Sequence, residues 1–291
     1  MADRELSGAP SMLPLFARAG VSLIPGASRL PFVGGGGGDV PANALTVSDV
    51  AVDRDRLTAY DRVCGFRLSD TLPPTYVHML AFPLHLALMT SGSFPLPAIG
   101  LVHIANRIEQ HRPLDAGERL SLRVWATPIY PHPRGRQFMI RTEARVGTEL
   151  VWEEAATNLA RGRGDESAPS PEGPPSSEAL PATATWKLAG DLGRRYGSVS
   201  GDLNPIHVHP LTARLFGFRS AIAHGMWTTA RCLAALDSEL PSRFSVEVAF
   251  RRPILLPATV QFAERAAADA ITFGVRDAKR DTPHLDGLVA R

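Results

Sequence analysis

The chain of 291 residues contains little cysteine, no surplus of either charge and no long apolar run. Its two cysteines, Cys64 and Cys232, are too few for a structural zinc site or a disulfide framework, so we expect two small buried side chains in a reducing compartment. The 31 basic and 29 acidic residues give a net charge of +2. This near-neutral balance gives no indication that the protein binds nucleic acid or an anionic membrane.

Neither a targeting segment nor a membrane-spanning segment is predicted. The first residues carry acids where a signal peptide carries bases, and two prolines and an arginine interrupt the apolar stretch that follows. The most apolar window, Tyr76–Met89, contains two histidines and a proline and is too short to span a bilayer. We therefore expect a soluble, cytoplasmic protein without membrane insertion.

Glycine and proline, 25 of each, are concentrated in two segments. The pentaglycine Gly34–Gly38 lacks the Lys-Ser/Thr and the strand–helix context of a phosphate loop, and it is predicted to be a mobile loop. The second segment, 161–182, has the Pro, Ser, Gly and Glu content of a linker. At roughly 150 residues per domain, we expect an N-terminal extension over 1–43, one domain over 44–160, the linker, and a second domain over 183–291.

Each half of the chain shows the same order of predicted elements: a strand, a buried helix and then several strands. Apolar spacing predicts one helix around Leu80–Leu88, where Pro83 fits only the first turn, and a second helix around Met226–Ala234. Strict alternation predicts a strand over Phe244–Phe250. Further strands are predicted at 45–52, 101–108, 120–124, 138–140, 149–159, 183–188, 260–262 and 271–275.

The two halves also align with each other. Val77-His78-Met79 before the first helix aligns with Ala223-His224-Gly225-Met226 before the second, and Val102–Arg107 aligns with Val246–Arg251 at a nearly constant offset. Such self-similarity suggests an internal duplication. The sequence therefore predicts an α+β fold of two tandem units, each a helix wrapped by an antiparallel sheet.

The halves differ most before the second helix, where Tyr196–His207 (YGSVSGDLNPIH) is read as a shaped turn without a counterpart in the first half. Asp202 and His207 are five residues apart in it, and we expect the turn to present both side chains to one small volume. A histidine that titrates near neutral pH beside a carboxylate is suited to acid–base catalysis. The alternative interpretation is a capped turn with a solvent-exposed histidine.

A second glycine-containing turn, His224-Gly225-Met226, precedes the buried helix. A glycine amide at a helix N-terminus can donate to a developing oxyanion. Together with Phe216-Gly217-Phe218, these two turns resemble the MaoC-like family of R-specific enoyl-thioester hydratases and dehydratases. The resemblance covers about residues 190–235 and is strongest to two-domain, double hot-dog members of the actinobacterial 3-hydroxyacyl-thioester dehydratase type.

This resemblance implies a double hot dog in which the second unit is catalytic and the first is the acyl-tunnel half. It implies that Asp202 and His207 share the acid and base roles, that Asn204 positions the site, and that the Gly225 amide binds the thioester carbonyl. The other expected substrate-binding residues are Ser200, Gly201, His224 and Trp227.

The implied reaction is the reversible syn dehydration of an (R)-3-hydroxyacyl thioester, carried by CoA or an acyl carrier protein, to a trans-2-enoyl thioester in fatty-acid metabolism. It needs no metal, flavin or nicotinamide cofactor. Two alternatives stay open: a hot-dog acyl-thioester hydrolase, and a non-catalytic carrier-binding subunit. Acyl chain length and oligomeric state are not predicted, a homodimer being one option.

The other histidines and several arginines are not expected to take part in the proton transfers. His78, His85 and His103 are expected in the core or along the acyl tunnel. His209 is not expected to act in catalysis, because one histidine suffices as the proton carrier. Candidates for contacts with CoA phosphates or with a carrier protein are Arg194, Arg195, Arg214, Arg251 and Arg252.

Overall fold

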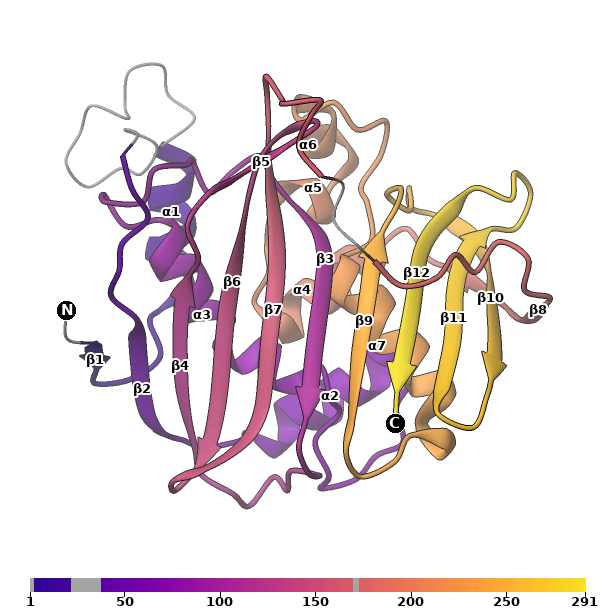
Figure 1. Ribbon diagram of the computed structural model, residues 1–291, viewed down its shortest axis with the longest axis horizontal. Helices are drawn as coiled ribbons and strands as arrows, with labels where there is room; N and C mark the ends of the chain where they lie inside the picture. The colour runs from indigo at the N-terminus through magenta and orange to yellow at the C-terminus, as the bar shows by residue number, and fades with distance from the viewer. Residues whose placement is uncertain (1–2, 22–37, 170–172) are drawn as a thin grey trace. The chain divides into compact units, whose positions relative to one another are not determined.

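The computed structural model describes residues 3–21, 38–169 and 173–291, which form two compact units (Figure 1). Each unit is assembled from three segments. Unit 1 comprises Met1–Val52, Val77–Ile104 and Gly117–Pro171, and unit 2 comprises Asp53–Tyr76, Ala105–Ala116 and Glu172–Arg291. Most of the predicted pentaglycine loop, at 34–37, lies outside the described residues. The expected division at 161–182 stays a prediction.

Unit 1 contains a mostly antiparallel sheet and a buried helix. The strands follow the order β1-β2-β4-β6-β7, with β5 paired to β6, and only the β1–β2 pairing is parallel. Its elements are β1 (Arg4–Leu6), α1 (Met12–Val21), β2 (Leu45–Val50), α3 (Tyr76–Met89), β4 (Leu120–Ala126), β5 (Tyr130–His132), β6 (Gly135–Val146) and β7 (Glu149–Arg161). β1 and α1 lie in the N-terminal extension, for which no element was predicted.

Helix α3 is apolar on all sides, which is typical of a helix buried by its surroundings. The expectation that Pro83 fits only a first turn was wrong, because α3 begins at Tyr76 and Pro83 lies in its interior. A proline there removes one backbone hydrogen bond. Burial of side chains such as Met79 and Leu84, both fully excluded from solvent, offsets that loss.

Unit 2 contains an antiparallel sheet in the order β3-β9-β12-β11-β10-β8 (Figure 1). Its strands are β3 (Leu101–Gln110), which belongs to this unit from Ala105 onward, β8 (Ala182–Leu188), β9 (Phe244–Phe250), β10 (Ala258–Ala266), β11 (Ala270–Asp277) and β12 (Pro283–Ala290). Its helices are α2 (Arg54–Cys64), α4 (Leu192–Ser200), α5 (Pro205–Val208), α6 (Pro210–Leu215), α7 (Gly225–Leu236) and the short 3-10 turn η2 (Asp237–Glu239).

The periodicity of apolar residues located the long elements. Both buried helices are confirmed as α3 and α7, and the Phe244–Phe250 strand is confirmed as β9. The reading of Tyr196–His207 as one turn was wrong in its first part, because Tyr196 lies inside α4 and the turn begins only at Gly201. Within the described ranges, no helix is long and apolar enough to cross a membrane.

A buried carboxylate fixes the start of the C-terminal segment to the sheet of unit 2. Asp286 on β12 accepts hydrogen bonds from the Ser177 backbone N–H (2.9 Å) and hydroxyl (2.7 Å), and from Arg251 Nε (2.7 Å). Its side chain is only 4% exposed. Ser177, although it lies in the predicted linker, is therefore part of the folded unit, and Arg251 is committed to a structural ion pair.

We predict that Asp286→Ala lowers the free energy of unfolding by about 2 kcal/mol or more, because it leaves buried donors without an acceptor. Urea denaturation measures the change. Asp70→Ala is the matched control, since it removes a similar carboxylate–Arg pair (3.0 Å to Arg54) that is about 60% exposed on both sides. The control should cost less than about 1 kcal/mol. Equal losses in the two variants would refute the role given to Asp286.

Candidate active site

The segment that follows α4 folds into a tight turn held by its own side chains. α4 ends because Gly201 adopts a left-handed conformation (φ 84°), which a residue with a side chain rarely adopts. The Asp202 N–H donates to Ser200 Oγ (3.1 Å), and the Asn204 N–H donates to Asp202 Oδ1 (3.1 Å). These bonds fix the direction of the Asp202 carboxylate.

Asn204 then begins the short helix that carries His207. Its Oδ1 accepts from the Ile206 N–H (3.3 Å), and Pro205 occupies the first helical position, where its missing N–H costs nothing. Asn204 is therefore the N-cap of α5. The cap helps to set where His207 lies relative to Asp202, and the catalytic positioning role expected of Asn204 stays a prediction.

His207 is buried and is held by one backbone carbonyl. Its Nδ1 lies 2.8 Å from the Ile222 carbonyl oxygen, which can only accept, so Nδ1 carries the hydrogen and Nε2 keeps its lone pair in the neutral ring. Burial lowers the pKa of His207 below its ordinary value. The imidazole is therefore neutral at neutral pH and able to accept a proton at Nε2.

His224 stacks on His207, with ring centroids 3.7 Å apart and planes inclined by 23°. Its Nε2 donates to the Asp202 carbonyl oxygen (3.0 Å), and its Nδ1 is buried without a hydrogen-bond partner among the described residues. Burial, together with the neighbouring His207, lowers the pKa of His224 to about 3. The His224 ring is therefore neutral at neutral pH and helps to hold the turn.

The turn and the start of α7 thus bring the predicted pair together. One carboxylate oxygen of Asp202 and one ring nitrogen each of His207 and His224 lie within 4.8 Å of one another. The Asp202 side chain is 25% exposed, so the group opens to solvent on its side. The site therefore presents a carboxylate and a neutral imidazole at one small, accessible place.

Gly225 begins α7 directly beside this group. The first amides of a helix have no partner within the helix and form its electropositive end. A Cβ at Gly225 would lie 2.9 Å from the Phe250 ring, so a larger residue here would force that ring on β9 to move. Gly225 is half-buried.

Three of the expected substrate-binding residues have structural roles within the fold. Ser200 is buried and its hydroxyl accepts the Asp202 N–H, while Gly201 ends α4. The buried Trp227 donates its indole N–H to the Val63 carbonyl oxygen (2.9 Å) and so ties α7 to α2. Any contact of these residues with substrate stays a prediction. His209 caps α6 through Nδ1 (3.1 Å to the Leu211 N–H).

Sequence reasoning missed Arg56 on α2. Its Nε donates to the Val199 carbonyl oxygen (2.7 Å) and its Nη2 to the Ser200 carbonyl oxygen (3.2 Å). A cation at the C-terminal end of α4 complements the helix dipole and satisfies carbonyls that the helix leaves open. Since 143 residues separate Arg56 from Val199, no local pattern could have indicated this contact.

Two glycines on one face of α4 allow its backbone to touch the Asp202–His207 segment. A Cβ at Gly193 would lie 1.9 Å from the His207 carbonyl oxygen, and one at Gly197 would lie 2.8 Å from the Asp202 carbonyl oxygen. The spacing of four residues places both glycines on the same side of the helix. That spacing was visible in the sequence and was the available signal for this contact.

We predict that Gly193→Ala destabilises the protein by about 2 kcal/mol or more, because the added methyl forces α4 away from α5. Thermal or urea unfolding measures the loss, and the imidazole NMR signals of His207 should shift. Gly190→Ala is the control, since a Cβ there meets nothing closer than 3.8 Å. If both variants behave like the unsubstituted protein, the close contact between α4 and α5 is wrong.

Comparison with known proteins gives concordant results. The family model described as "MaoC like domain" matches residues 173–285. The chain is 33% identical, over 96% of its own length and 98% of the relative's, to 3-hydroxyacyl-thioester dehydratase X of Mycobacterium tuberculosis. The crystal structure of HtdX of M. tuberculosis matches with 32% identity and a TM-score of 0.76, covering 85% of this chain and 99% of that one.

More distant structures share the fold. A MaoC-like dehydratase of Phytophthora capsici has a TM-score of 0.73 at 20% identity, covering 86% of this chain and 95% of its own. A conserved hypothetical protein of M. tuberculosis described as having a double hot-dog fold has a TM-score of 0.52 at 14% identity, covering 87% and 94%. The predicted α+β double hot-dog fold class is thereby confirmed, and the chain belongs to the MaoC-like dehydratase family.

Proposed function

We propose that this chain catalyses the reversible syn dehydration of (R)-3-hydroxyacyl thioesters to trans-2-enoyl thioesters. The observation that carries the proposal is the grouping of Asp202, a neutral His207 and the N-terminus of α7 at one accessible place. The M. tuberculosis relative named a 3-hydroxyacyl-thioester dehydratase, which matches along 96% of this chain, supports the same reaction.

The Asp202 and His207 side chains are suited to share the two proton transfers. Dehydration breaks the C2–H bond, forms the C2=C3 double bond from its electrons, and breaks the C3–O bond as the hydroxyl takes up a proton and leaves as water. C2 and C3 are neighbours, so two groups within 4.8 Å of each other can reach both positions from one face of the substrate. Delivery from one face gives syn chemistry.

The N-terminus of α7 supplies what the proton transfer needs at the carbonyl. A C2 proton becomes acidic only when the thioester carbonyl is polarised, and the Gly225 amide with its helix dipole is the proposed donor. Loss of one such donor typically costs about 3 kcal/mol of transition-state stabilisation. Asn204 and His224 hold the turn and act as positioning residues.

The acyl group is proposed to be carried by CoA or by an acyl carrier protein, in fatty-acid metabolism in the cytoplasm. Of the arginines expected to meet a phosphate or a carrier, three have partners within the fold. Arg251 pairs with Asp286, Arg214 Nε donates to the Arg219 carbonyl oxygen (3.4 Å), and Arg194 Nη1 donates to the Val208 carbonyl oxygen (3.3 Å). Arg195 and Arg252 stay the candidates for that contact.

Neither alternative is favoured by an observation in the structure. A hydrolase of this fold would need a carboxylate on the helix that faces the thioester, and the first one after Gly225 is Asp237, beyond the last residue of α7. A non-catalytic binding subunit would have no use for a neutral, buried His207 beside Asp202.

We predict that Asp202→Asn and His207→Ala each reduce kcat/KM for hydration of a trans-2-enoyl-CoA by at least a hundredfold, since each removes one of the two proton carriers. Loss of the enoyl-thioester ultraviolet absorbance measures the rate, and circular dichroism checks the fold. His209→Asn, which keeps an N-cap for α6, is the control and should retain activity within about threefold. Full activity in either Asp202→Asn or His207→Ala would contradict the proposed roles of these two residues.

A further inference from the structure

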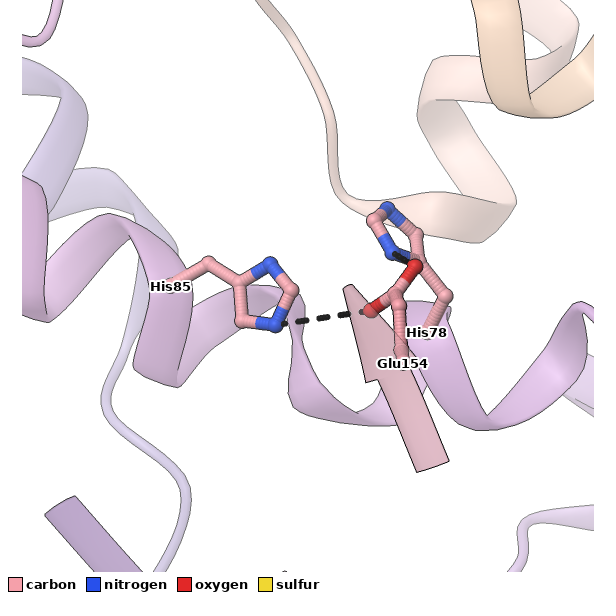
Figure 2. A group of neighbouring side chains, drawn as sticks. All are labelled: His78, His85 and Glu154. Carbon is pink, nitrogen blue, oxygen red and sulfur yellow. Dashed lines mark hydrogen bonds and ion pairs between the residues drawn. The ribbon is translucent and has the colours of Figure 1, made fainter. Parts of the chain in front are cut away.

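Unit 1 contains a second group of converging titratable side chains, far along the sequence from the proposed active site. Figure 2 shows His78 and His85 extending from α3 toward the Glu154 carboxylate on β7. His78 Nδ1 lies 2.6 Å from Glu154 Oε1, and His85 Nε2 lies 3.8 Å from Glu154 Oε2. The three donor atoms lie within 4.8 Å of one another.

The burial of this group excludes an organic substrate. His78, His85 and Glu154 are 8%, 3% and 2% exposed. The two histidines are thus buried as expected, but the expectation of a core or tunnel role gave no reason for the carboxylate beside them. A species that meets all three side chains must be small enough to fit among packed residues, and a single ion satisfies that condition.

The donor atoms of the group suit a cation. The Glu154 carboxylate offers an anionic oxygen ligand, and each of the two imidazole rings offers a nitrogen ligand. Two imidazoles and one carboxylate form a donor set that proteins use for zinc, where neutral imidazole is the binding form.

The distances also suit an ion. Two ligands about 2.0–2.1 Å from a tetrahedral zinc are separated by ~3.4 Å. The observed separations, 2.6 Å to Glu154 Oε1 and 3.8 Å to Glu154 Oε2, lie on either side of that value. The shorter one is a hydrogen bond whose proton an ion would replace. His85 Nε2 is also hydrogen-bonded to the Thr142 hydroxyl (2.7 Å), and an ion bound at that nitrogen would replace this bond too.

The relative orientation of the rings distinguishes this group from the one in unit 2. The planes of His78 and His85 are inclined by 84°, so lone pairs lying in the two ring planes can point to one place. His207 and His224 instead stack with an angle of 23°, and each donates one ring N–H to a backbone carbonyl. Parallel rings cannot direct their lone pairs at a shared ion.

We propose that His78, His85 and Glu154 bind one divalent transition-metal ion, with zinc as the best match, which links α3 to β7. The site is closed by burial, so we assign it a structural role within unit 1. It is independent of the proposed dehydration, since none of its residues belongs to the Asp202–His207 group.

The test uses the full chain, treated with a chelator and dialysed, and Zn²⁺ as the probe. Isothermal titration should give one equivalent bound to the unsubstituted protein, and saturating Zn²⁺ should raise the melting temperature. Glu154→Gln and His85→Gln should each weaken binding at least tenfold. The matched control His207→Ala removes a donor from the other three-residue group and should bind Zn²⁺ like the unsubstituted protein.

Two outcomes would overturn the proposal: no zinc bound by the unsubstituted protein, or binding that is lost in His207→Ala and kept in Glu154→Gln. A crystal of the unsubstituted protein grown with Zn²⁺ gives a direct check if a variant fails to fold. An anomalous peak among His78, His85 and Glu154 supports the site, and a peak only elsewhere contradicts it. Hydration activity is measured in parallel, so a failure of the metal proposal leaves the dehydratase assignment separately testable.

Discussion

The contact between the backbone of α4 and the Asp202–His207 segment is the constraint on which the rest of the site depends. It exists because Gly193 and Gly197 have no side chains where the helix meets the carbonyl oxygens of His207 and Asp202. Arg56 closes the C-terminal end of the same helix by binding its last carbonyls. The glycine contacts and the Arg56 hydrogen bonds thus fix the position of α4. Because the turn after Gly201 starts from this fixed helix, the Asp202 and His207 side chains lie next to each other.

Burial then determines the chemistry of the imidazoles. The Ile222 N–H donates to the Ile206 carbonyl oxygen (3.0 Å), and the Ile222 carbonyl oxygen accepts from His207, so one short segment holds both sides of α5. Removed from water, His207 and His224 stay neutral at pH values where an exposed histidine begins to protonate. One ring is thereby kept as a proton acceptor, and the other as a fixed support for the turn.

The sequence indicated those features of the structure that depend on residues close together in the chain. Apolar periodicity located α3, α7 and the long strands, because their burial is continuous along one face. The Asp-x-Asn-Pro-x-His turn was visible because each side chain serves its own neighbours through caps and Asx-type bonds. Gly225 was visible as the residue that begins α7.

Contacts made across long sequence separations could not be predicted in this way. Arg56 meets Val199 from 143 residues away, and His78 meets Glu154 from 76 residues away. The prediction for Pro83 was wrong for a related reason. Proline disfavours a helix interior, but the burial of α3 in the folded protein outweighs this local preference. His78 was aligned with His224 in the sequence, yet the structure gives the first a carboxylate partner on a strand and the second a stacked imidazole.

The central claim is that Asp202 and His207 act from one face of an enoyl thioester activated at α7. The most direct measurement is hydration of a trans-2-enoyl-CoA in D₂O, with the stereochemistry of the product read by NMR and chiral chromatography. We expect the (R)-3-hydroxyacyl-CoA with a single deuterium at C2, added on the same face as the C3 hydroxyl. An (S) product, anti addition, or release of free CoA without hydration would contradict the account.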